Sequence, residues 1–123
     1  MDYKKLIDMK QKELAETVAN AWNALDAKII EPYLADDFEY ESFWVFETMK
    51  GKDSYMEYLT GKYGSIKRTG SKLTAETVFQ DGIDEYVVAL DQDGRRDAAL
   101  QIWTSEGKIT KMWMRPLDMV GLK

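Results

Sequence analysis

The sequence predicts an α+β fold in which N-terminal helices pack on a mainly antiparallel sheet. Three observations predict it. Helical patterns come early in the chain, one strand pattern follows them, and four consecutive strand patterns separated by turns occupy the second half. Strands that follow one another directly pair as an antiparallel meander, whereas parallel neighbours need a long crossover. The length of 123 residues suits one domain, 1–123, which can bury its own core.

The N-terminal segment has the pattern of an amphipathic helix with one buried stripe. Polar residues fill its outer face, while apolar residues recur at steps of three or four: Leu14, Val18, Trp22, Leu25 and Ile29. A second short helical piece is expected at about residues 29–35, because Pro32 is tolerated in the first turn of a helix. Tyr33 and Leu34 would form its inward side.

Residues 38–43 then alternate as a strand does, with Phe38, Tyr40 and Ser42 on one face. The next helix is expected to begin near Gly51 and to end between residues 64 and 67. The segment between this strand and this helix is expected to be a loop, in which Trp44 forms either a lid or a satellite of the core.

The rest of the chain predicts a four-strand meander. Strand patterns cover residues 73–80, 85–90, 97–104 and 108–115, and turn pairs separate them: Asp81-Gly82, Asp93-Gly94 and Glu106-Gly107.

The composition excludes several chemistries. Histidine and cysteine are absent, which removes the commonest general base near neutral pH, thiol nucleophiles, disulfides and the usual zinc ligands. We therefore expect no metal and no cofactor. The net charge of −5 argues against a nucleic-acid partner, because phosphate binding needs clustered positive charge. The apolar runs are too short to span a bilayer and no signal pattern begins the chain, so a cytoplasmic protein without a membrane partner is expected.

Four short motifs resemble the nuclear transport factor 2-like superfamily, the cone fold of SnoaL-like cyclases and ketosteroid isomerases. They are Trp22-Asn23-Ala24-Leu25-Asp26, Tyr33-Leu34-Ala35-Asp36-Asp37-Phe38, Gly51-Lys52 and Glu106-Gly107-Lys108-Ile109. The resemblance covers the chain from about residue 14 onward. The stretch from Tyr40 to Lys62 also resembles an uncharacterised bacterial branch. The superfamily includes enzymes, binders and scaffolds, so the resemblance implies a fold and leaves the function open.

The resemblance implies that the sheet is curved and that the helices cover its concave face, which gives a cone with an internal pocket. Alternation along the strands then gives the expected ligand-binding residues: Trp22, Tyr40, Ser42, Trp44, Tyr58, Gln101, Trp103, Met112 and Met114. The convex face would carry Val87, Leu100, Ile102 and Trp113, an apolar set that favours a homodimer through the sheet. A bulge in any strand would exchange the two faces beyond it.

The resemblance also implies where isomerase catalysis would need its groups. The proton-shuttling aspartate, the hydrogen-bonding acid and the helix tyrosine of ketosteroid isomerases fall on Ser42, Ala99 and Trp22, so we expect no catalysis of that type. Gln101 is the preferred candidate for ligand recognition, because a buried amide needs a partner, although an internal hydrogen bond would also satisfy it.

Three functions remain open at this point. The first is binding of a small apolar or aromatic molecule in the pocket. The second is a cyclase or isomerase that uses a carboxylate such as Asp97 with a tyrosine, although an ion pair of Asp97 with Arg95 or Arg96 is the simpler interpretation. The third is a protein-interaction scaffold that uses the convex face. Lys62, one helical turn after Tyr58, is either a rim residue that pairs with an anionic ligand or an ordinary surface lysine.

Overall fold

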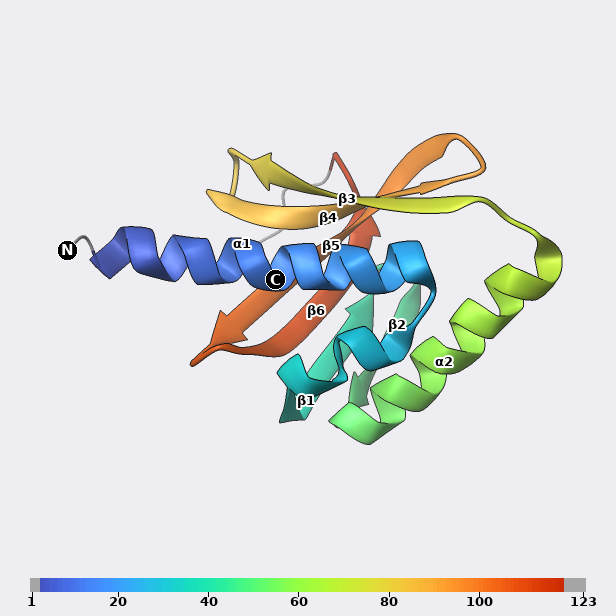
Figure 1. The fold of residues 1–123 in the computed structure, drawn as a ribbon, viewed down its shortest axis with the longest axis horizontal. Helices are drawn as coiled ribbons and strands as arrows, with labels where there is room; N and C mark the ends of the chain where they lie inside the picture. The colour runs from blue at the N-terminus through green and yellow to red at the C-terminus, as the bar shows by residue number, and fades with distance from the viewer. Residues whose placement is uncertain (1–2, 119–123) are drawn as a thin grey trace.

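The computed structural model describes residues 3–118, with the side chains of residues 3–9 and of residue 46 outside the description. Two α-helices and a six-stranded sheet make up the fold (Figure 1). The helices are α1 (Tyr3–Ala24) and α2 (Lys52–Thr69). The strands are β1 (Leu34–Ser42), β2 (Val45–Lys50), β3 (Leu73–Gln80), β4 (Glu85–Gln92), β5 (Arg95–Ser105) and β6 (Lys108–Pro116). Two short 3-10 helices, Ala27–Ile29 and Glu31–Tyr33, join α1 to β1.

The strand order in the sheet is β2-β1-β6-β5-β4-β3. All neighbouring strands are antiparallel except β1 and β6, which run parallel, so the predicted α+β fold with a mainly antiparallel sheet is confirmed. The residues expected to form a loop before α2 instead form β2, which pairs with β1 as a hairpin. The sheet therefore has two early strands and not one.

Both helices pack on the same face of this sheet. In Figure 1, α1 crosses in front of the meander strands, while α2 lies beside β1 and β2. The predicted stripe of α1 is buried at Leu14, Val18 and Trp22. Alanines beside the stripe are also buried, which lets the helix lie close to β3 and β4. Leu34 is buried as expected, but Tyr33 is 42% exposed, so its predicted inward position is wrong.

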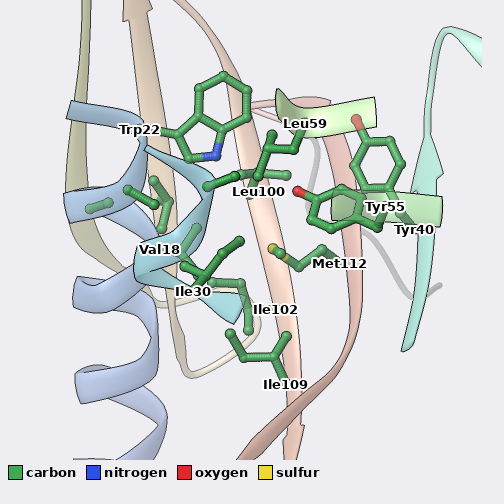
Figure 2. Close-up of a cluster of buried hydrophobic side chains, with 14 of the residues drawn as sticks. Val18, Trp22, Ile30, Tyr40, Tyr55, Leu59, Leu100, Ile102, Ile109 and Met112 are labelled. Carbon is green, nitrogen blue, oxygen red and sulfur yellow. The ribbon is translucent and has the colours of Figure 1, made fainter. Parts of the chain in front are cut away.

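The centre of the cone is filled by side chains from both layers. Val18, Trp22 and Ile30 approach from the α1 side and meet Leu100, Ile102 and Met112 of the strands, with Tyr40 and Tyr55 beyond them (Figure 2). Leu100 and Ile102 are therefore part of the concave core, and their predicted place on the convex face is wrong.

A register shift in the β4–β5 hairpin explains this difference. The turn at Asp93-Gly94 begins a regular ladder in which Gln92 pairs with Arg95. Continued without interruption, that ladder would pair Val88 with Ala99. The observed partner of Val88 is Leu100, because the register shifts by one residue between Leu90 and Gln92. Alternate residues point to opposite faces, so a one-residue shift exchanges the faces of all later β5 residues.

Gln101 and Trp103 consequently lie on the convex face, away from the helices, and their predicted place in the pocket is wrong. Gln101 is buried there against β6, where it pairs with Trp113. Trp103 is half-buried, and the Lys111 ammonium lies 5.3 Å from the centre of its ring.

The side chain of Arg115 links several residues on the convex face through hydrogen bonds. This fully buried side chain donates from Nε to Gln101 Oε1 at 2.9 Å and from Nη2 to Gln80 Oε1 at 2.5 Å. Nη1 donates to the carbonyl oxygens of Pro116 and Leu117. Burial lowers the pKa of this guanidinium, and the four contacts compensate part of the lost hydration.

The apolar residues on the convex face are already covered within the chain: Val87, Ala89 and Ala99 have no exposed surface, and Trp113 is nearly buried. The homodimer was expected because Val87, Leu100, Ile102 and Trp113 were predicted to form an apolar convex face. Since Leu100 and Ile102 lie on the other face, the observed set of residues differs, and the homodimer stays a prediction. Among the described residues, no helix is long and apolar enough to cross a bilayer.

Candidate functional site

A pocket of about 600 Å³ opens at one end of the cone. The β1–β2 turn, the β4–β5 turn and the end of β6 surround it, and α1 and α2 each contribute to its wall. Its lining consists of Trp22, Tyr40, Ser42, Trp44, Val45, Tyr58, Lys62, Leu73, Leu90, Gln92, Asp93, Arg95, Asp97, Ala98 and Met114.

The inner part of the pocket is apolar. Trp22, near the C-terminal end of α1, is 2% exposed and packs edge-on against Tyr63, with ring centres 5.0 Å apart. Leu90 and Met114 reach the pocket from β4 and β6, and both belong to the buried core. These side chains offer a broad, adaptable surface to an apolar molecule.

Tyrosines form the wall on the side of α2 and β1. The ring of Tyr40 lies 5.6 Å from that of Tyr58 and 5.0 Å from that of Tyr55, centre to centre. Figure 2 shows Tyr40 and Tyr55 side by side at the edge of the buried cluster. Burial raises the pKa of Tyr40, and the neighbouring Tyr58 raises it further, while a hydrogen bond with Ser42 lowers it. Tyr40 is therefore a neutral phenol at physiological pH and can donate a hydrogen bond.

The β1–β2 turn brings Ser42 and Trp44 to the outer part of the pocket. Ser42 Oγ accepts a hydrogen bond from the backbone N–H of Trp44 at 3.3 Å, and the N–H of Phe43 donates to the Met114 carbonyl oxygen at 2.7 Å. These contacts hold the turn next to β6 and leave the Trp44 side chain 56% exposed. Trp44 and Val45 thus present apolar surface both to the pocket and to solvent.

Charged residues form the rim. Arg95 Nη2 lies 3.1 Å from Asp97 Oδ2, and the side chain of Asp97 is 65% exposed. Asp93 Oδ1 accepts a hydrogen bond from the Lys72 backbone N–H at 2.9 Å. Both carboxylates that line the pocket, as far as the described residues go, are thus solvated and already engaged. The simpler interpretation of Asp97, an ion pair with a neighbouring arginine, is the one observed.

Six of the nine ligand-binding residues expected from the sequence line this pocket: Trp22, Tyr40, Ser42, Trp44, Tyr58 and Met114. Their role in binding stays a prediction. Met112 is fully buried in the core and does not reach the pocket, while Gln101 and Trp103 lie on the convex face. The buried amide oxygen of Gln101 accepts an internal hydrogen bond, from Arg115 Nε.

The sequence analysis missed four lining residues at or near the β4–β5 turn. Gln92, Asp93, Arg95 and Ala98 all come from this hairpin. Asp93-Gly94 was a clear turn signal, but a turn signal does not say which layer of the fold the turn will approach. Within residues 3–118, no group of three or more Asp and Glu residues could hold a metal ion.

No protein-family model matches the sequence, and no curated protein matches it either. Solved structures do match. A SnoaL-like protein of unknown function from Burkholderia thailandensis superposes with a TM-score of 0.67 at 19% identity, covering 88% of this chain and 94% of that one. An NTF2-like protein of unknown function from Mesorhizobium loti gives 0.68 at 10% identity, with 89% and 92% covered. A putative ketosteroid isomerase from Kribbella flavida gives 0.64 at 14% identity, with 94% and 84% covered.

Proposed function

Given that the chain has the nuclear transport factor 2-like fold, we propose that it binds a small molecule with a flat apolar or aromatic body in the pocket at the open end of the cone. The observation that carries the proposal is the lining of that pocket. Its volume of about 600 Å³ lies within the range of small-molecule sites, and its walls combine a buried tryptophan with phenol and hydroxyl groups.

Binding is favoured over catalysis because of where the carboxylates lie. A cyclase or isomerase of the kind considered above needs an acid or base beside the reacting atoms, inside the water-excluding part of the pocket. Asp93 and Asp97 stand at the rim, and the inner wall is built from aromatic, aliphatic and hydroxyl groups.

Binding is also favoured over a scaffold role for the convex face. The large apolar side chains most exposed on the described part of the chain are Tyr33, Phe43, Trp44, Val45, Tyr58 and Phe79. Trp44, Val45 and Tyr58 line the pocket. The apolar residues of the convex face are instead buried under other parts of the chain, which leaves little apolar surface there for a partner.

A thermal-shift screen against a panel of aromatic and aliphatic metabolites tests the proposal. A compound present at about a hundredfold excess over its Kd should stabilise the protein by about 2.7 kcal/mol. The bound compound should also quench tryptophan fluorescence, because Trp22 and Trp44 line the pocket while Trp103 and Trp113 lie on the convex face.

The variant Ala98→Phe provides the matched control. Ala98 lines the pocket, so a phenyl group there should reduce its volume and abolish both the shift and the quenching. Circular dichroism would establish that the variant is folded. A panel that produces no shift with the parent protein, or shifts that survive in Ala98→Phe, would contradict binding in this pocket.

A further inference from the structure

The charged residues at the pocket are not equivalent. Arg95 and Asp97 pair with each other, and Asp93 accepts a backbone hydrogen bond. Lys62, on α2, also lines the pocket and is only partly exposed, yet it forms no ion pair within residues 3–118. Its ammonium group is therefore the cation in the lining that is not already neutralised by a carboxylate of the chain.

Side chains with hydroxyl donors line the same pocket as this cation. Tyr58 precedes Lys62 by one helical turn, so the two side chains share a face of α2, and both line the pocket. The ring of Tyr40 lies 5.6 Å from that of Tyr58, and Ser42 follows on the same strand face. An ammonium group beside phenol and hydroxyl donors is the combination that binds an oxyanion, because charge-assisted hydrogen bonds are stronger than neutral ones.

Apolar side chains form much of the remaining lining. Trp22, Leu90 and Met114 belong to its buried part, and Trp44, next to Ser42 in the β1–β2 turn, is largely exposed. A molecule that fits this lining has a flat apolar body and a negative group at one edge.

We propose that the ligand is an aromatic carboxylate, with its ring system against Trp22 and Trp44 and its carboxylate between Lys62 and Tyr58. This inference rests on the proposed function and adds the chemical class of the ligand and the residue that selects it. Lys62 is the specificity-determining residue, since an apolar wall alone favours the neutral form of a ring system, because a carboxylate loses hydration there without a partner.

Three probes with the same ring system test the charge preference by isothermal titration calorimetry: 2-naphthoate, 2-naphthylmethanol and 2-naphthylmethylammonium. We expect naphthoate to bind about tenfold more tightly than the alcohol, the difference that one charge-assisted contact supplies, and the ammonium to bind most weakly. High salt should reduce the difference in affinity between naphthoate and the alcohol, because ions screen the electrostatic contact with Lys62.

The variant Lys62→Met tests whether Lys62 causes the preference for naphthoate over the alcohol. This variant should bind naphthoate no more tightly than the alcohol and should leave the affinity for the alcohol within about twofold. The control is Lys67→Met, a substitution on the same helix at an exposed lysine outside the lining, which should keep the full preference.

The possible results separate this inference from the proposed function. Equal affinity for naphthoate and the alcohol, or a preference that persists in Lys62→Met, would overturn the aromatic carboxylate while leaving the pocket as a binding site. If none of the three probes binds, the inference is also overturned, and the proposed function is then decided by the broader thermal-shift panel.

Discussion

Replacing Gln101 by methionine tests whether this residue serves the ligand or the fold. The side chain is 5% exposed, and its Oε1 accepts a hydrogen bond from Arg115 Nε at 2.9 Å. Methionine keeps a similar length and volume but removes the acceptor, so one buried charged donor loses its partner. A hydrogen bond to a charged group contributes about 1.5–3 kcal/mol, and we expect the free energy of unfolding to fall by about 2 kcal/mol.

The expected shift in melting temperature follows from the chain length. Globular proteins have an unfolding entropy of about 2.1 cal/mol/K per residue, so 123 residues give roughly 260 cal/mol/K. A loss of about 2 kcal/mol then lowers Tm by about 8 °C. Urea unfolding followed by circular dichroism measures the free energy directly, and a differential scan measures Tm.

Gln92→Met is the matched control for stability only, because it makes the same substitution at an exposed glutamine on β4 that also lines the pocket, and it should change stability by less than about 0.5 kcal/mol. Ligand affinity is the second readout. Gln101→Met should leave binding in the pocket unchanged, since Gln101 lies on the opposite face of the sheet. A variant as stable as the parent, or one that is stable but binds a ligand more weakly, would refute this assignment.

Three further predictions concern the core, the tyrosines and the assembly. Leu100→Ala should lower the free energy of unfolding by about 2–5 kcal/mol in urea titrations, because the side chain is fully buried between sheet and helices, and a loss below about 1 kcal/mol would contradict its inward position. Burial raises the pKa of Tyr40, Tyr55 and Tyr63 in the folded state. The stability that these neutral phenols contribute is fully present below the unfolded-state pKa near 10 and is lost as pH rises from there through the higher folded-state pKa. The free energy of unfolding should therefore fall in alkaline solution, and absorbance at about 295 nm should show that these phenols ionise late. The covered convex face favours a monomer of 14.2 kDa in light scattering, and twice that mass would instead support the homodimer that the sequence predicts.

The elements of the fold were predictable from the sequence where one periodic pattern is long. The stripe of α1 has its buried residues at Leu14, Val18 and Trp22 as the 3.6-residue period requires. The four meander strands were also found, because each alternates and each is bounded by a turn pair. The strand β2 was not, because only Phe43 and Trp44 separate it from β1, and these two residues lack the glycine or asparagine of a turn signal.

The face that each strand presents to the helices was harder to predict, and β5 shows why. Alternation fixes which residues share a face, but one register shift reverses the assignment for the rest of the strand. The residues from Arg95 to Ala98 do not predict the register shift, because the charged side chains at the start of β5 suit both a regular hairpin and a bulge. Core packing selects the face that β5 presents to the helices, because Leu100 and Ile102 bury more apolar surface inside than Gln101 and Trp103 would.

The same shift also bears on where the open space of the cone lies. With Leu100 and Ile102 turned inward, apolar side chains fill the middle of the cone, and the open space is confined to the end where the β1–β2 and β4–β5 turns meet. Turn residues such as Trp44, Asp93 and Arg95 therefore form much of the lining. Because turns accept substitution more readily than the packed core does, the ligand that we propose for this pocket should depend on these few positions. The selectivity of this chain should accordingly depend on Lys62 and the turn residues, and its stability on the β5 register and Arg115.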